Sequence, residues 1–469
     1  MDRETFKHWS HKAVDWSANY METVADKPVR AQTRPGDIAA QLPPSPPEAG
    51  EDMAQILADL DRIIMPGMTH WQHPRFFAYF PANASPPSII AEQITAAMGA
   101  QCMLWQTSPA ATELETVALD WLRQMIGLPA TFEGVIQDSA SSATLAAILT
   151  GRERALSFSG NQRGLSQGPT IRVYCSEQVH SSIDKAVWIA GIGQDNLVKI
   201  ATNDRHQIDT GALEAAIVAD RQAGLRPATV IAAVGGTSIG ASDNLNAVGA
   251  IARRHDLFMH VDAAWAGSAL ICPEHRHLID GVELADSFVF NPHKWLLTNF
   301  DCSAHFVRSP VDLVRTLAIQ PDYLRSQTST GLNYSEWSVP LGRRFRALKL
   351  WFVIRSYGVE ALRQMIRNHC LWANELAQKI SEHKDFEIIT QPALSLFTFR
   401  YAPDGVANLD DLNARLLSAI NGDGRIYLTQ TRHAGAYVIR FQVGQLYTSE
   451  QDVALAWDVI REIAGSLDA

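Results

Sequence analysis

From about residue 115, short apolar runs alternate with segments long enough for helices, and this alternation constrains the fold more than any other feature. The runs are strand-length and often β-branched. Strands joined through helices lie parallel, so the pattern predicts an α/β domain on a mostly parallel sheet. Ligands of such sheets bind beyond the carboxyl ends of the strands. The expected strands are 135–137, 172–175, 229–234, 257–261, 287–290 and 304–307.

The first part of the sequence is expected to be helical. Apolar residues recur at helical spacing from Phe6 to Trp16, and a proline-rich connector at 41–52 precedes a second amphipathic stretch at 53–64. An isolated helix would expose its tryptophan-rich stripe. We therefore expect this arm to pack on another part of the molecule or on a second subunit.

The chain of 469 residues is too long for one ordinary compact core. A long helical stretch begins near Trp351, and beyond about residue 380 short strands and helices mix. These changes predict three parts, namely an N-terminal helical segment at 1–82, a large α/β domain at 83–360 and a small C-terminal α+β domain at 361–469.

Charge and cysteine content narrow the function classes. Forty Lys and Arg against fifty Asp and Glu give a net charge of −10 with no basic tract, which disfavours binding to nucleic acid or to an anionic membrane. No stretch has the length and apolarity of a membrane span or signal peptide, so we expect a cytoplasmic protein. Five scattered cysteines favour a reducing compartment over a disulfide framework or a metal site. They are Cys102, Cys175, Cys272, Cys302 and Cys370.

Several residues that follow the expected strands can carry chemistry. After the first strand, the backbone N–H groups of Ser139, Ala140 and Ser141 open a helix and could bind an anion such as phosphate. His180 and Thr237 follow the second and third strands. Taken singly, these features are an ordinary serine-rich helix cap, a surface histidine and a turn.

Two further strand ends carry Asp262 and Lys294. Alone, the first could form a structural ion pair and the second could extend its amine to solvent. Together with an anion cup they match one ligand, pyridoxal phosphate. Its phosphate requires the cup, its pyridine nitrogen a carboxylate, and its aldehyde a lysine amine.

Long blocks of the sequence resemble the aromatic-L-amino-acid decarboxylase group of the group II pyridoxal-phosphate-dependent amino acid decarboxylases. The resemblance spans nearly the whole chain and implies the type I, aspartate-aminotransferase-like fold. It also implies a homodimer with the active site at the subunit interface and residues 1–82 as the dimerisation segment. The blocks are HWQHPRFFAYFPA (70–82), SPAATELETVALDWL (108–122), the run 260–304 that begins HVDAAWAG, and PLGRRFRALKLWF (340–352).

The resemblance implies a role for each site residue. Lys294 matches the Schiff-base lysine, Asp262 the partner of the pyridine nitrogen, and His180 the imidazole stacked on the cofactor ring and close to the substrate carboxylate. The segment 321–337 resembles the catalytic loop, in which Tyr323 matches the tyrosine that protonates the substrate α-carbon. Ser139, Ala140, Ser141, Asn291 and His293 match phosphate-side residues, and Thr237 and Ala264 line the ring.

An aromatic substrate wall is implied by Trp71, Tyr79, Phe80 and Pro81, since a flat apolar pocket prefers an aromatic side chain. Gly342 matches a position at which related histidine decarboxylases carry serine, and it indicates a roomy pocket.

Three positions depart from the family pattern. Asp138 replaces the small residue that usually precedes the phosphate-binding serine, and a carboxylate beside a phosphate is unfavourable unless it points away. Gln101 and Met103 replace an isoleucine and a phenylalanine that in animal relatives reach the pocket of the neighbouring subunit. These changes affect the choice of substrate more than the reaction.

The sequence therefore predicts decarboxylation of an aromatic L-amino acid to an arylalkylamine. Dihydroxyphenylalanine, tryptophan, 5-hydroxytryptophan, tyrosine and phenylalanine all remain open as substrates. An aromatic acetaldehyde synthase of the same family, or a decarboxylase of another amino acid such as histidine, is the nearest alternative. A non-catalytic binding protein is disfavoured because Lys294, Asp262 and His180 are all present.

Overall fold

The computed structural model describes residues 1–319 and 331–467, and these residues form two compact units. Met1–Pro81 and Leu371–Ala469 make up the first unit, and Ala82–Cys370 the second. The first unit thus joins the two ends of the chain. The three-part division expected from the sequence stays a prediction. Within the described ranges, no helix combines the length and apolarity that crossing a membrane would require.

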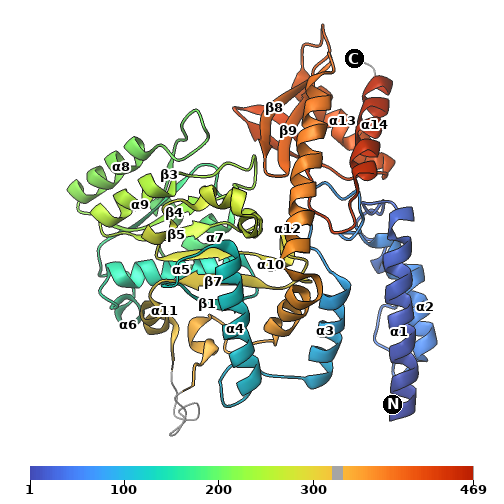
Figure 1. Ribbon diagram of the computed structural model, residues 1–469, viewed down its shortest axis with the longest axis horizontal. Helices are drawn as coiled ribbons and strands as arrows, with labels where there is room; N and C mark the ends of the chain where they lie inside the picture. The colour runs from blue at the N-terminus through green and yellow to red at the C-terminus, as the bar shows by residue number, and fades with distance from the viewer. Residues whose placement is uncertain (320–330, 468–469) are drawn as a thin grey trace. The chain divides into compact units, whose positions relative to one another are not determined.

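The second unit, hereafter the large unit, is built on a seven-stranded sheet with the strand order β1-β7-β6-β5-β4-β2-β3. Strands β2 to β6 run parallel, and β7 is antiparallel to both β6 and β1. The predicted mostly parallel sheet is thereby confirmed (Figure 1). The strands are β1 Glu133–Gln137, β2 Ile171–Ser176, β3 Leu197–Ile200, β4 Arg226–Ala233, β5 Phe258–Asp262, β6 Ser287–Phe290 and β7 Ser303–Val307.

Strand β3 is absent from the strands expected from the sequence. It has four residues, only Ile200 is buried, and it pairs with β2 alone. Lys199 points to the solvent side and forms an ion pair with Asp184 at 2.9 Å. Short strands that carry a lysine are typical of sheet edges, and their weak apolar pattern explains the omission.

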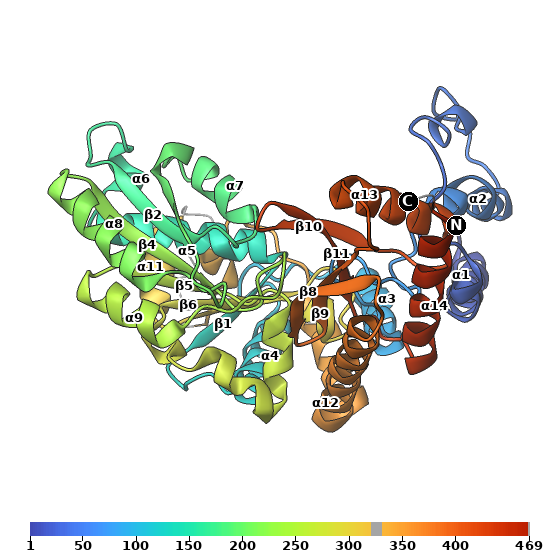
Figure 2. The same ribbon diagram turned by 90° about the horizontal axis from the view of Figure 1, so that it is seen from above.

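Helices cover both faces of the sheet. Helices α5 and α7 lie on one face, and α8 and α9 lie on the other (Figure 2). In α5 the small residues Ala143, Ala146 and Ala147 are buried, which lets the helix axis approach the sheet closely. The helices of this unit are α3 Pro86–Met98, α4 Pro109–Ile126, α5 Ala140–Ala155, α6 Gly160–Arg163, α7 Ser182–Ile189, α8 Thr210–Gln222, α9 Leu245–Arg254, α10 Pro292–Trp295 and α11 Pro310–Leu317.

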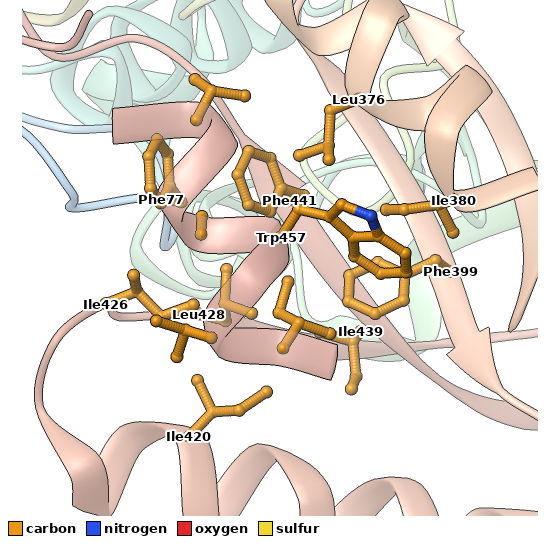
Figure 3. Packing of buried hydrophobic residues seen from close by; sticks show 14 of the residues in the cluster. Phe77, Leu376, Ile380, Phe399, Ile420, Ile426, Leu428, Ile439, Phe441 and Trp457 are labelled. Atoms are coloured by element: carbon orange, nitrogen blue, oxygen red, sulfur yellow. The ribbon is translucent and has the colours of Figure 1, made fainter. Parts of the chain in front are cut away.

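The first unit contains a four-stranded antiparallel sheet in the order β10-β11-β9-β8. Phe77, Phe441 and Trp457 belong to its buried core, which Figure 3 shows from close by. This mixture of strands and helices was expected beyond residue 380. The elements are β8 Phe386–Ala393, β9 Leu396–Tyr401, α13 Leu409–Asp423, β10 Thr429–His433, β11 Ala436–Gln442 and α14 Glu450–Ser466.

The N-terminal arm is helical, as its apolar spacing predicts. Helix α1, Arg3–Thr23, begins after Asp2, whose carboxylate accepts a hydrogen bond from the N–H of Thr5. Helix α2, Met53–Asp59, continues as a π-helical turn to Ile64. Helix α1 buries none of its residues, and Phe6 is 60% exposed. The expectation that this face packs on another surface stays a prediction.

The long helix expected near Trp351 is α12, Arg346–Ser381. At Gly358 the backbone has a φ of 70°, which interrupts the helical geometry. Glycine adopts this left-handed conformation without the strain that a Cβ would add.

Candidate active site

A cavity of about 200 Å³ lies at the carboxyl ends of the parallel strands in the large unit. Its walls come from the segments that follow β1, β2, β4, β5 and β6. Topology explains the gathering, because these strands point the same way and their ends share one edge. All of the predicted cofactor-binding residues line it, namely Ser139, Ala140, Ser141, His180, Thr237, Asp262, Ala264, Asn291, His293 and Lys294.

The start of α5 forms the expected anion cup. Ser139 caps the helix, and its Oγ accepts a hydrogen bond from the N–H of Ser142 at 3.3 Å. The first N–H groups of a helix have no partner within the helix and carry a partial positive charge. This end of the cavity is therefore suited to a phosphate.

Asp138, the unusual residue before the cup, is not among the residues that line the cavity. Its Oδ1 accepts a hydrogen bond from the Ser139 hydroxyl at 3.2 Å. Its charge also acts on Arg346, which pairs with Asp301 at 2.7 Å. The carboxylate thus has partners of its own beside the cup.

Asp262 ends strand β5 between two parallel neighbours. It is paired with Ala233 of β4 and with Val289 of β6. Its Oδ1 accepts a hydrogen bond from the N–H of Ala264 at 3.0 Å, which fixes the carboxylate at the cavity. A carboxylate held in this way can keep a nearby basic nitrogen protonated.

Lys294 lies in α10, the short helix that follows β6. Burial lowers the pKa of its amine, and the nearby Asp262 charge partly opposes this shift. The backbone is held by Asn83, whose side-chain amide donates to the Lys294 carbonyl at 2.6 Å. An amine with a lowered pKa, aimed into a cavity, is suited to reaction with an aldehyde.

The two residues predicted to lie on the phosphate side, Asn291 and His293, are buried and hydrogen-bonded. Asn291 and His293 are 4% and 3% exposed. Asn291 Oδ1 accepts a hydrogen bond from the Ser303 hydroxyl at 2.7 Å, and His293 Nδ1 accepts one from the N–H of Cys302 at 2.9 Å. Burial lowers the pKa of His293 to about 3, so its imidazole is neutral.

His180 follows β2 and its ring lies beside α7. Its Nδ1 is 3.1 Å from the backbone nitrogen of Ser182 and 2.9 Å from the Ser182 hydroxyl. Burial is the main cause that lowers the pKa of the ring, with Lys294 adding to the shift and Asp262 opposing it.

The structure adds lining residues that the sequence did not single out. Gly235 has a φ of 76° in the turn after β4, and a Cβ there would lie 3.0 Å from the Trp265 ring. The GGTS turn and the DAAWAG run supplied Thr237, Asp262 and Ala264 to the predicted site, but their other residues were not assigned to it. The additional lining residues are Ser182, Ala233, Gly235, Gly236, Trp265 and Phe300.

The predicted substrate wall belongs to the first unit. Trp71 and Tyr79 stack with ring centroids 5.9 Å apart, and Tyr79 contacts Tyr427 edge to face at 6.1 Å. Phe80 packs against Gly444, where a Cβ would lie 2.7 Å from the ring. The role of these residues and of the adjoining Pro81 in substrate binding stays a prediction.

Gln101, Met103 and Gly342 lie together in the large unit, outside the lining of the cavity. The Oε1 atom of Gln101 accepts a hydrogen bond from the N–H of Arg343 at 2.7 Å. The carbonyl of Met103 accepts one from Ser335 at 3.0 Å. A Cβ at Gly342 would lie 3.3 Å from the Gln101 amide, so this side chain occupies part of the space that the glycine leaves. Tyr323 lies outside the described residues.

A family model described as the pyridoxal-dependent decarboxylase conserved domain matches residues 35–402. The chain belongs to this family. The decarboxylase is 42% identical over 480 residues to phenylacetaldehyde synthase of Arabidopsis thaliana, covering 100% of this chain and 97% of that protein. It is 41% identical over 482 residues to aromatic-L-amino-acid decarboxylase of Sus scrofa, covering 100% and 98%.

The fold agrees with this membership. The crystal structure of Oryza sativa TDC with PLP and tryptamine matches with a TM-score of 0.96 and 37% identity, covering 99% of this chain and 98% of that one. This likeness confirms the predicted type I fold of pyridoxal-phosphate-dependent enzymes. The decarboxylase is accordingly a pyridoxal-phosphate-dependent carboxy-lyase.

The cavity of the decarboxylase fits the cofactor by its own chemistry. An anion cup, a fixed carboxylate and a buried amine of lowered pKa face one enclosed space. Ser139, Ala140 and Ser141 would hold the phosphate, Asp262 would hold the pyridine nitrogen and Lys294 the aldehyde. When bound, pyridoxal phosphate supplies an electron sink for the bond that breaks.

Proposed function

We propose that this decarboxylase removes the α-carboxylate of an aromatic L-amino acid, releasing carbon dioxide and the arylalkylamine. The observation that carries the proposal is the convergence of Lys294, Asp262, His180 and the cup at Ser139 on one cavity. Relatives and a solved neighbour of closely similar length are named for aromatic amino acids or their products. The family resemblance assigns Trp71 and Tyr79 to the substrate wall, and their exposed stack is a flat apolar surface of the kind that suits an aromatic side chain.

Each residue has a distinct task in this proposal. Asp262 keeps the pyridine nitrogen protonated, which strengthens the electron sink. Lys294 would hold the aldehyde of the cofactor through its buried amine. His180 contacts the substrate carboxylate, and Tyr323 returns a proton to the α-carbon. Orienting the carboxylate before the bond breaks supplies a large part of the rate enhancement.

We further propose that the enzyme works as a cytoplasmic homodimer with the active site at the subunit interface. The relatives leave the preferred substrate open, because their names include both tyrosine and tryptophan. One hydrogen bond to a ring hydroxyl can decide between such substrates.

An aromatic acetaldehyde synthase is the second candidate, since a relative at 42% identity carries the name phenylacetaldehyde synthase. Such an enzyme consumes oxygen and yields an aldehyde, ammonia and peroxide in place of the amine. Because relatives of that type tend to lack the loop tyrosine or the stacking histidine, the presence of Tyr323 and His180 favours decarboxylation.

The test is incubation of the cofactor-loaded protein with the five aromatic amino acids, histidine and glutamate. Carbon dioxide, amine, aldehyde and peroxide are measured together, with Lys294→Ala as the inactive control. Amine equal to carbon dioxide with an aromatic substrate supports the proposal. Aldehyde and peroxide without amine would establish the synthase, and turnover of histidine or glutamate alone would contradict the aromatic assignment.

A further inference from the structure

The ring of His180 is held from the first turn of α7 by a contact that fixes its hydrogen-bonding role. Ser182 is the first residue of that helix, and its backbone nitrogen lies 3.1 Å from His180 Nδ1. The Ser182 hydroxyl lies 2.9 Å from the same atom. The carbonyl of His180 also accepts the N–H of Ile183 at 3.1 Å, so main chain and ring are both tied to α7.

A backbone N–H can only donate a hydrogen bond, so Nδ1 must accept and cannot carry a proton. The hydroxyl of Ser182 then also donates to this nitrogen. The proton of the neutral ring is therefore on Nε2, and protonation of Nδ1 would set two N–H groups against each other. The ring is accordingly held as the neutral Nε2–H tautomer.

The electrostatic surroundings of His180 also favour the neutral ring. The positive end of the α7 dipole lies at Ser182, and a cationic ring there is unfavourable. The charged groups that act on the ring are Asp262, at the end of β5, and Lys294, in α10, and these two oppose each other. Burial lowers the pKa of the ring further. In the described part of the chain, the side chain of Ser181, the N-cap residue of α7, makes no cap hydrogen bond. The N–H of Ser182 is instead accepted by the ring nitrogen Nδ1 of His180.

We propose that Ser182 is a positioning residue that holds His180 as a neutral Nε2–H donor facing the ligand in the cavity. The inference rests on the proposed function, in which that ligand is an amino acid carboxylate. A carboxylate loses its charge as carbon dioxide leaves. A cation beside it would stabilise the ground state more than the transition state, whereas a neutral donor orients the group without that penalty.

The decisive variant is Ser182→Asp. This variant places a carboxylate, which can accept hydrogen bonds but not donate them, next to Nδ1. Acidic residues are well tolerated in the first turn of a helix, so α7 should still form. Ser181→Asp is the matched control, since it adds the same charge one residue earlier. Ser182→Ala removes the hydroxyl and keeps the backbone donor, and Ser182→Thr restores a hydroxyl.

The first readout is the ¹⁵N spectrum of histidine-labelled protein, without and with pyridoxal phosphate, in which His180 is assigned by its loss in His180→Gln. We expect a protonated Nε2 and an unprotonated Nδ1 at pH 7 in wild type, Ser182→Ala, Ser182→Thr and Ser181→Asp. In Ser182→Asp the added carboxylate should stabilise the cationic ring against the backbone donor, so the ring should titrate at least one pH unit higher. A wild-type ring that is protonated on Nδ1, or cationic at pH 7, overturns the proposal.

The second readout is the pH profile of decarboxylation. Ser182→Asp should lower kcat at least tenfold, with a smaller change in KM, and move the acidic limb of the profile to higher pH. Ser182→Thr and Ser181→Asp should stay within about threefold of wild type. Equal losses in both aspartate variants would mean that Ser182 acts only on helix stability. If the spectra show the expected tautomer but the enzyme turns over no aromatic amino acid, the proposed function is refuted and the tautomer assignment still holds.

Discussion

The buried ion pair of Glu115 and Arg343 supports the edge strand that leads to the anion cup. The two side chains are 3% and 2% exposed, with Nη2 to Oε1 at 2.7 Å and Nη1 to Oε2 at 3.1 Å. Glu115 Oε1 also accepts the N–H of Ile136 at 2.8 Å, and Arg343 Nη2 donates to the Ile136 carbonyl at 2.7 Å. Because β1 has a strand partner on one side only, these bonds replace a missing neighbour.

We expect Glu115→Gln to lower the free energy of unfolding by about 3–5 kcal/mol, because the Arg343 charge stays buried without its counter-ion. The amide still offers an oxygen to Ile136, so the loss comes chiefly from the unpaired charge. Glu115→Ala removes this acceptor as well and should cost about 1–3 kcal/mol more. The matched control is Asp120→Asn on the same helix, whose partner Arg123 lies at 2.7 Å with the aspartate half exposed. Such a pair contributes below about 1 kcal/mol.

The assay is urea unfolding followed by tryptophan fluorescence at fixed protein and cofactor concentration. Glu115→Gln should lower the midpoint strongly, whereas Asp120→Asn should lie close to wild type. If the two variants shift the free energy by similar amounts, the reasoning about the buried pair is wrong. A change in the slope of the transition would instead point to an altered unfolded state.

Three further predictions follow from other sites. Burial lowers the pKa of His305 to about 3 from an ordinary value near 6.5, so the unfolded chain binds the proton first and stability falls as pH drops below 6.5. His305→Phe should therefore reduce the loss of unfolding free energy between pH 7 and pH 5 by about 2 kcal/mol, measured by urea titration at both values. Gly235→Ala should weaken pyridoxal phosphate binding in an absorbance titration, because a Cβ there would clash with the Cβ of Ala266 and also meet the Trp265 ring. Gly224→Ala has a similar φ with open space around it and should leave binding unchanged. Tyr323→Phe should lose amine and gain aldehyde and peroxide, and unchanged amine output would remove Tyr323 from the mechanism.

The large sheet and most of its chemistry could be predicted from local sequence. Apolar runs of strand length are visible in a short window, and parallel strands bring their carboxyl ends to one edge. Residues that follow different strands, such as Ser139, Asp262 and Lys294, therefore meet without any knowledge of packing. Strand β3 was missed because its short pattern, with Lys199, does not differ from that of a loop.

The sequence by itself determined the fold class, the family and the residues at the strand ends, because these depend on periodicity and on residue type. Tertiary structure decided which polar groups pair across the chain. Glu115 and Arg343 are 228 residues apart, and no local pattern predicts their contact. It also decided that Ser182 faces His180 Nδ1, since the direction of the α7 start depends on the packing of that helix against α5. Residue type limits which chemistry is available, and packing selects which atoms carry it out.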